Sequence, residues 1–183
     1  MAAALAVQDR LGMQTTSSDI GCEIEIRPLT AADRQGIANA FSRLSEQTRR
    51  RRFHGLASRL GERDLDRLTR IDHHRHEALI AIAPDPARIV GVARYIMLPR
   101  DPRAAEVAIA VDDEWQGRGI GCRLMSDLVT KAHAEGIKQL LAYVGTDNHR
   151  AIGWVARAGG VVAVRDGDSF VYAIPVDRER RAA

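Results

Sequence analysis

A glycine-rich turn between an apolar strand and an amphipathic helix constrains this chain more than any other feature. Residues 106–111 read Glu-Val-Ala-Ile-Ala-Val, and residues 117–121 read Gly-Arg-Gly-Ile-Gly. Glycine lets the backbone turn tightly and removes side chains that would block a ligand. The first N–H groups of the following helix have no partners within the helix, and the helix dipole favours negative charge there. The pattern therefore predicts an anion site of the kind that holds a pyrophosphate.

Two common phosphate-binding motifs do not fit this turn. A dinucleotide-binding turn needs a glycine three residues after Gly119, where this chain has Cys122. That fold also usually begins at this strand, whereas here about a hundred residues precede the turn and the chain closes with a β-hairpin. A P-loop needs Gly-Lys followed by Ser or Thr, and the turn has none. Arg118 and Arg123 can add charge-assisted contacts to a phosphate.

The remaining pattern predicts a single α/β (α+β) domain over residues 22–176, and 183 residues suffice for one domain. Its order β-α-α-α-β-β-β-α-β-α-β-β predicts one mixed central sheet with helices on both faces. We expect residues 1–21 to form a flexible leader and residues 177–183 a charged tail. Strands are expected at residues 22–27, 78–82, 89–97, 106–111, 139–144, 161–164 and 170–174, with turns at residues 99–102 and at Asp166-Gly167. Helices are expected after Thr30, over residues 45–53 and 62–71, from Ile120 to a stop at Gly136, and over residues 149–158.

Composition limits which kinds of partner and which cellular compartment we expect for the protein. The net charge of +3, from 27 basic and 24 acidic residues, is too small to indicate a nucleic-acid partner. No stretch approaches the roughly 20 apolar residues of a membrane helix, and the N-terminus lacks the basic start of a signal peptide. Two cysteines make no disulfide framework and no zinc signature. We therefore expect a cytoplasmic protein without a membrane partner, either a monomer or a homodimer.

The glycine turn carries a family resemblance. Residues 116–121, Gln-Gly-Arg-Gly-Ile-Gly, match the acyl-CoA pyrophosphate motif Arg/Gln-x-x-Gly-x-Gly/Ala of the GNAT superfamily of acyl-CoA-dependent N-acyltransferases. Asn148, followed by Ala151 and Gly159, resembles that family's later Asn-x-x-Ala…Gly segment. The order of elements from Ile24 to Ile174 is similar as well. The resemblance therefore covers nearly the whole body of the chain.

Further segments look like the GNAT domain of bacterial protein-lysine acetyltransferases. They are Arg27-Pro28, Leu44-Ser45, Arg52-Phe53-His54-Gly55, Asp72 with His76, Val92-Ala93-Arg94-Tyr95 and Ala105-Glu106-Val107-Ala108. In those proteins the domain is often joined to a regulatory domain, for which this sequence is too short.

The resemblance implies a position for acetyl-CoA, used as a co-substrate without a metal. In this fold the cofactor enters where two parallel strands splay apart, and its pantetheine arm pairs with the strand before the glycine turn. That strand segment is Ile109, Ala110 and Val111. The pyrophosphate position carries over to Gln116, Gly117, Arg118, Gly119, Ile120 and Gly121, with Cys122 and Arg123 beside it. Asn148 would contact the cofactor arm.

Glu106 is the candidate general base for an amine that attacks the thioester. A lysine amine has a pKa of about 10.4, so it must lose a proton near pH 7. Alternation places Glu106 on the same strand face as Ala108 and Ala110, small residues that leave room for a substrate. The relatives that the chain resembles use a glutamate at this place. The alternative is an exposed glutamate in a surface ion pair. A strand N–H would polarise the carbonyl.

The chain departs from the family at Val155, where many members have a tyrosine that protonates the leaving thiolate. Either the thiolate leaves through water, or another group serves, or the site is degenerate. The expected function is acetyl-CoA-dependent N-acetylation of an amine, preferably a protein lysine side chain. The alternatives are an acyl-CoA-binding or sensing module without turnover, and an acetyltransferase for a small-molecule amine.

Three other features have two interpretations each. His73, His74 and His76 could hold a metal, but a fourth ligand at metal spacing is lacking, so we expect none. His76 alone could line the substrate side. The basic run at residues 49–52 is either a solvated helix face or a contact for an acidic surface or the cofactor's 3′-phosphate. Cys122 could have a lowered pKa at the helix N-terminus or could be packed beneath the turn.

Overall fold

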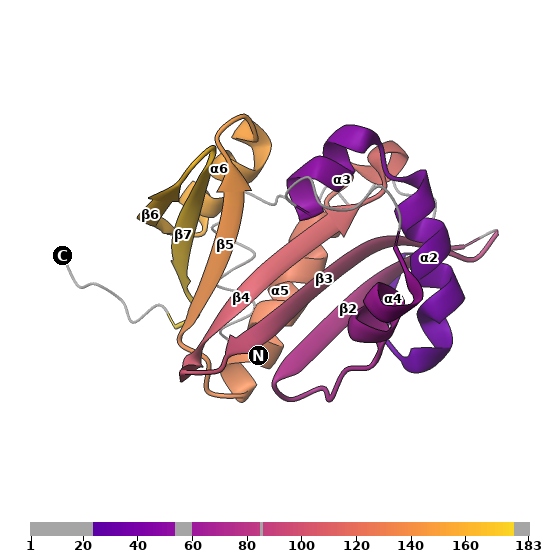
Figure 1. Ribbon diagram of the computed structural model, residues 1–183, viewed down its shortest axis with the longest axis horizontal. Coiled ribbons are helices and arrows are strands. Elements are labelled where there is room, and N and C mark those ends of the chain that lie inside the picture. Colours follow the sequence, from indigo (N-terminus) through magenta and orange to yellow (C-terminus); the bar gives the residue numbers. More distant parts are fainter. Residues whose placement is uncertain (1–23, 54–59, 85, 178–183) are drawn as a thin grey trace.

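A seven-stranded mixed sheet forms the body of the protein, with strand order β1-β2-β3-β4-β5-β7-β6 (Figure 1). The computed structural model describes residues 24–53, 60–84 and 86–177, so the expected leader and all but the first residue of the expected tail lie outside it. The strands are β1 Glu25–Pro28, β2 His76–Ala83, β3 Arg88–Leu98, β4 Asp101–Val111, β5 Gln139–Gly145, β6 Val161–Asp166 and β7 Ser169–Pro175. The helices are α2 Arg34–Arg43, α3 Glu46–Phe53, α4 Glu62–Thr69, α5 Ile120–Ala134 and α6 His149–Arg157, with single 3-10 turns η1 Ala31–Asp33 and η2 Asp113–Trp115. Within the described ranges, no helix has the length and apolar character needed to cross a membrane.

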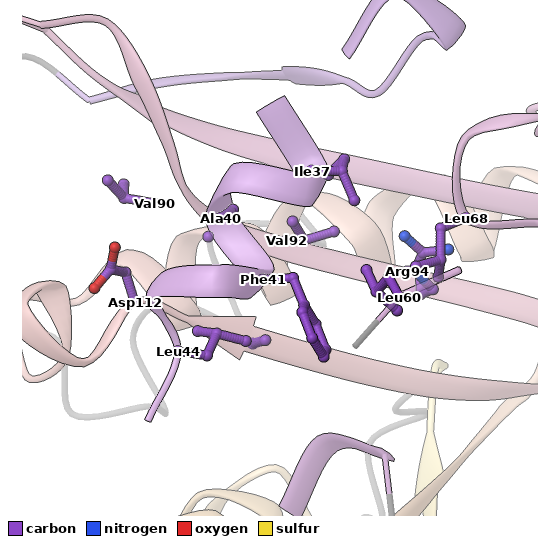
Figure 2. Close-up of a pocket in the computed structure, with 12 residues that line it drawn as sticks. Ile37, Ala40, Phe41, Leu44, Leu60, Leu68, Val90, Val92, Arg94 and Asp112 are labelled. Carbon is purple, nitrogen blue, oxygen red and sulfur yellow. The ribbon is translucent and has the colours of Figure 1, made fainter. Parts of the chain in front are cut away.

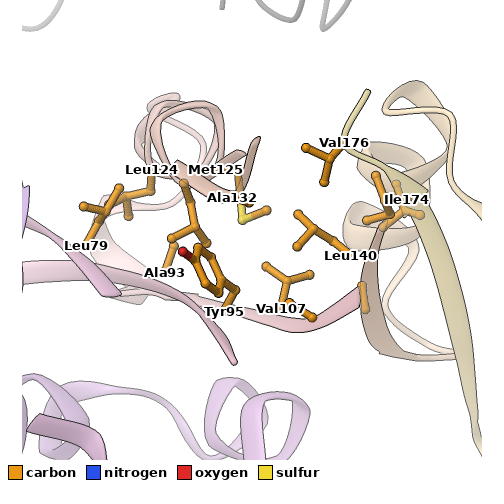
Figure 3. Packing of buried hydrophobic residues seen from close by; sticks show 14 of the residues in the cluster. Leu79, Ala93, Tyr95, Val107, Leu124, Met125, Ala132, Leu140, Ile174 and Val176 are labelled. Atoms are coloured by element: carbon orange, nitrogen blue, oxygen red, sulfur yellow. The ribbon is translucent and has the colours of Figure 1, made fainter. Parts of the chain in front are cut away.

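Helices cover both faces of the sheet, which confirms the predicted fold class. On one face α5 packs through Leu124 and its neighbours against Ala93 and Tyr95 of β3 (Figure 3). On the other face α2 and α4 cover β2 and β3 through Ile37 and Leu65. Because side chains alternate along a strand, Ala93 and Tyr95 face α5, while Val92 on the same strand faces α2. We call these the α5 face and the α2 face.

Two turns differ from the sequence prediction. Strand β4 begins at Asp101 rather than at Glu106, because Pro102 does not end the strand. Pro102 lies in a bulge of β4, because Asp101 pairs with Leu98 of β3 and the next paired residue, Ala105, pairs with Met97. Residues in a bulge do not need an N–H for pairing, so proline is tolerated there. The last hairpin turns at residues 167–168 instead of at Asp166-Gly167, with Gly167 at a φ of 53°.

Candidate active site

Strands β4 and β5 separate before either strand ends. Their parallel pairing runs from Ala104–Gln139 to Val107–Ala142, yet β4 continues to Val111 and β5 to Gly145. This confirms the expected splayed parallel pair. Residues 108–111 therefore present a strand edge that β5 does not pair.

The backbone of Ile109 and Val111 points into the opening between the two strands. In an extended strand, the N–H and C=O of one residue lie on one side and those of the next residue on the other. The N–H of Asp112 donates to the carbonyl of Val90 on β3 at 2.8 Å, so Ala110 also directs its backbone toward β3. Alternation then turns Ile109 and Val111 toward the opening.

The turn that follows β4 leaves the start of α5 uncapped. Gly117 has a φ of 81° and Gly119 a φ of 78°, left-handed conformations that favour glycine. Gly119 is the N-cap, and the N–H of Arg123 makes the first helical bond, to the carbonyl of Gly119 at 3.1 Å. No side chain in the described part of the chain caps this end. The N–H groups of residues 120–122 are therefore available to an anion.

The uncapped helix start lies directly against the free strand edge. A Cβ on Gly121 would stand 3.4 Å from Cδ1 of Ile109 and 3.7 Å from Cγ2 of Val111. Residues 107–111 span about 13 Å at about 3.3 Å per residue. The protein thus offers an anion site at the end of an unpaired strand edge. These groups fit a ligand that joins a pyrophosphate to an amide-bearing arm, as coenzyme A does.

Two arginines lie beside the turn, one of which sequence reasoning missed. Gln116 donates from Nε2 to the carbonyl of Val111 at 3.1 Å, and its Oε1 accepts from Nη1 of Arg150 at 3.1 Å. Gln116 thereby links the end of β4 to the first turn of α6. The guanidinium of Arg118 stacks on the ring of Trp115, 4.8 Å from its centroid. A basic residue two positions after Asn148 was the available signal for Arg150.

Cys122 and Arg123 extend away from the glycines. Cys122 is half-buried. Arg123 is exposed and donates from Nη1 to the carbonyl of Ile24 at 3.4 Å, a contact that directs its guanidinium toward β1.

Two aspartates anchor the turn to the corner between α2 and α3. The buried carboxylate of Asp112 accepts from Nε of Arg43 at 2.9 Å. Asp113 accepts from the N–H of Ser45 at 2.8 Å and from the hydroxyl of Thr48 at 2.8 Å. Burial opposes these bonds, but together they hold the pKa of Asp113 below its usual range. The turn is therefore fixed from the side of α2 and α3.

The loop after β5 places Asn148 at the start of α6, and α6 carries Val155 into the core. Asn148 is the N-cap of α6, and its Oδ1 accepts from the N–H of Ala151 at 3.2 Å. Its amide NH₂ is not used by this cap. The preceding Asp147 pairs with Arg51 of α3 at 2.9 Å, so part of the basic run serves an internal ion pair. Val155 is 1% exposed and packs in the core, so that position cannot present a group to the site.

Glu106 lies in a row of residues that crosses the sheet on the α2 face. It pairs with Ile96 of β3 and with Leu141 of β5, and Ile96 pairs in turn with His76 of β2. Glu106 is exposed. His76 is two strands away, about 10 Å at about 4.8 Å per strand, so the two side chains lie apart. Burial, and then the guanidinium of Arg94 at 3.4 Å, lower the pKa of His76 to about 4, so His76 is neutral at pH 7.

A mostly apolar cavity of about 50 Å³ lies between α2 and the β3–β4 pair (Figure 2). Phe41, Leu44, Val92 and Ala110 line its length, and Arg94 stands at one end. Ala110, which lies on β4 beyond its pairing with β5, is thus also a lining residue of this cavity.

The three neighbouring histidines contact different partners. His73 has a positive φ of 57° and contacts the buried carboxylate of Glu77 at 2.8 Å, which also pairs with Lys131 at 2.9 Å. No group of three metal-ligating side chains comes together among the described residues. The contacts of the three histidines are His73 with Glu77, His74 with Glu135, and His76 with Arg94.

Comparisons with known proteins agree with this geometry. A family model described as the acetyltransferase (GNAT) family matches residues 41–159. A curated acetyltransferase of Pseudomonas aeruginosa is 31% identical over 160 residues, which cover 86% of this chain and 85% of that protein. The acetyltransferase Pat of Mycolicibacterium smegmatis is 30% identical over 123 residues, which cover 67% of this chain but only 37% of Pat.

A solved structure shows the same fold. The GNAT domain of S. lividans PAT superposes with a TM-score of 0.77 at 23% identity, covering 83% of this chain and 90% of that domain. The family model spans the splayed strands and the uncapped glycine turn that were described above. This chain therefore belongs to the GNAT family of acetyltransferases, which transfer acyl groups from acetyl-CoA.

Proposed function

We propose that the chain acetylates an amine, a lysine side chain of a protein, with Glu106 as general base. One observation supports the proposal most strongly. Along β4 and the turn after it, Glu106 comes first, the strand edge that β5 does not pair comes next, and the uncapped start of α5 follows. When bound, acetyl-CoA supplies an acetyl group activated as a thioester. The resemblance to bacterial protein-lysine acetyltransferases and the similarity to Pat favour a protein acceptor.

The groups that would hold the cofactor are mostly backbone. The N–H groups of residues 120–122 would bind the pyrophosphate, with Arg118 and Arg150 adding positive charge beside it. The backbone of Ile109 and Val111 would pair with the pantetheine arm, and the NH₂ of Asn148 would donate to the same arm. An N–H of this strand edge is also suited to polarise the thioester carbonyl.

Glu106 would accept the proton that the amine must lose. Its side chain lies on the α2 face, three residues before Ile109, which is about 10 Å along an extended strand. The proton therefore passes from the amine to Glu106 through water. With Val155 buried in the core, the leaving thiolate takes its proton from solvent.

The rival function is cofactor binding without turnover, and the buried valine at the family's tyrosine position favours it. Release of free thiol from acetyl-CoA with a panel of amines separates the two. Glu106→Gln should lower kcat by about a hundredfold or more and leave the Kd for coenzyme A unchanged. Glu25→Gln, an exposed strand glutamate at the far edge of the sheet, should change neither. Tight cofactor binding with no thiol release on any amine would establish the binding module instead.

A further inference from the structure

We propose that an exposed apolar strip around Glu106 docks the acceptor, and that its occupant is an extended polypeptide whose lysine is flanked by apolar side chains. This proposal rests on the proposed function, in which Glu106 takes a proton from a lysine. The strip lies on the α2 face of β3, β4, β5 and β6. We define the acceptor strip as Ile96, Glu106, Leu141, Tyr143, Val161 and Val164.

Strand register places these residues on one face. Glu106 pairs with Ile96 on one side and with Leu141 on the other. Leu141 pairs with Ala173 of β7, which pairs with Val161 of β6. Directly paired residues point to the same side of a sheet, so the row from Ile96 to Val161 lies on one face, with buried Ala173 between Leu141 and Val161. Tyr143 and Val164 join it because both pair with Val171.

Exposed apolar side chains gather on this strip. The described part of the chain has six large apolar side chains that are exposed, and four of them belong to it: Ile96 at 47%, Tyr143 at 39%, Val161 at 65% and Val164 at 56%. The other two are Ile109, on the edge assigned to the cofactor, and Val162, on the opposite face of β6. Scattered exposed apolar residues need no explanation, whereas exposed apolar residues gathered on one face of a sheet mark a binding surface.

The size and charge of the strip identify its occupant. From β3 to β6 there are four strand spacings in the order β3-β4-β5-β7-β6, or about 19 Å at about 4.8 Å each. That length matches about six residues of extended polypeptide at about 3.3 Å per residue and exceeds what a small amine can cover. Glu106 is the charged member of the strip, and its complement is a lysine with apolar neighbours.

Two peptides of equal length and net charge, each with one lysine, test this proposal. One has leucine and valine around the lysine and the other has serine and asparagine. A small amide of lysine is the third acceptor. The apolar peptide should have the higher kcat/KM on the native protein, by about tenfold. Val161→Ser/Val164→Ser should raise the KM for the apolar peptide about fivefold and leave kcat/KM for the small amide unchanged.

Val162→Ser is the matched control, because Val162 is 53% exposed on the same strand but on the opposite face. It should leave all three acceptors unchanged. Equal kcat/KM for the two peptides, or an equal loss in Val162→Ser, overturns the proposal. A third result also overturns the proposal: sedimentation shows that the native protein is a dimer, that Val161→Ser/Val164→Ser converts it to a monomer, and the KM for the peptides is unchanged. The strip would then join two copies of the chain. Turnover of the small amide without peptide preference refutes the strip alone, whereas no thiol release with any acceptor refutes the proposed function and the strip together.

Discussion

Replacing Gly119 by alanine should cost the same stability as replacing Gly136, but only the first change should weaken cofactor binding. Both glycines have a φ of 78°, and a Cβ on either would meet no atom within 4 Å. They stand at opposite ends of α5. Left-handed strain costs alanine about 1–2 kcal/mol, and the reduced freedom of the unfolded chain returns about 0.4–1 kcal/mol. Each variant should therefore lose about 1 kcal/mol, or about 3 °C in Tm.

The two substitutions should differ in their effect on the Kd for coenzyme A, because only Gly119 adjoins the unpaired N–H groups of residues 120–122. A methyl group there occupies space beside the expected pyrophosphate. Loss of one hydrogen bond to a charged group is worth about 1.5–3 kcal/mol, so the Kd for coenzyme A should rise roughly tenfold to hundredfold. Gly136→Ala should leave this Kd unchanged.

Urea unfolding without ligand and calorimetry with coenzyme A measure the two effects separately. Gly119→Glu should abolish binding, because it adds a bulky anion at the same point. If Gly136→Ala weakened binding as much as Gly119→Ala, the loss would come from helix stability and not from the site. If Gly119→Glu bound with native affinity, the placement of the pyrophosphate would be wrong.

Two further substitutions and two pH dependences test the packing and the buried charges of the fold. Lys131→Met removes the 2.9 Å partner of buried Glu77 and should lower the free energy of unfolding by about 3 kcal/mol; an unchanged urea midpoint would contradict this. Burial raises the pKa of Glu77, but the bonds from Lys131, His73 and the N–H of Ala78 together hold it below its usual value. The stabilisation by the ionised Glu77 should therefore be complete at pH 7 and lost as the pH falls through the lowered pKa, which urea midpoints across acidic pH measure. An NMR titration should find the folded His76 neutral down to about pH 5, whereas a titration near pH 6.5 would refute its burial. Because the histidine of the unfolded chain takes a proton near pH 6.5, His76 should lower the free energy of unfolding as the pH falls from 6.5 toward 4. Gly160→Ala would put a Cβ 2.4 Å from Cγ1 of Val155 and should cost about 1–3 kcal/mol, measured as a lower Tm.

The glycine turn was predictable because its signal is local. An apolar strand, glycines at alternate positions and a helix with apolar residues four apart lie within one short segment, and each has a direct physical meaning. The structure confirms the strand before the turn and the helix start without a side-chain cap, and it adds the left-handed conformations of Gly117 and Gly119. Apolar spacing, as at Ile37 and Phe41, predicted where the helices lie, but a 3-10 turn at Ala31–Asp33 follows Thr30, so α2 itself begins at Arg34.

Contacts between distant segments left no such signal. Ser45 and Asp113 are 68 positions apart, and no local pattern in either predicts that the turn is anchored to the corner between α2 and α3. The splay of β4 from β5 came from the family resemblance, because periodicity does not show where two strands stop pairing. Spacing placed Arg123 beside the turn, whereas the carbonyl that its guanidinium contacts belongs to Ile24, 99 positions earlier and just before β1.

The anchoring of the turn by Asp112 and Asp113 has a consequence for how two ligands bind at the site. The same corner of α2 and α3 that these aspartates hold also contributes Phe41 and Leu44 to the cavity beside β4. We expect a nucleotide bound at the turn to hold this corner more firmly, so that a second molecule placed against the corner binds more tightly. Such an energetic linkage is reciprocal, so each substrate should tighten the binding of the other by the same factor.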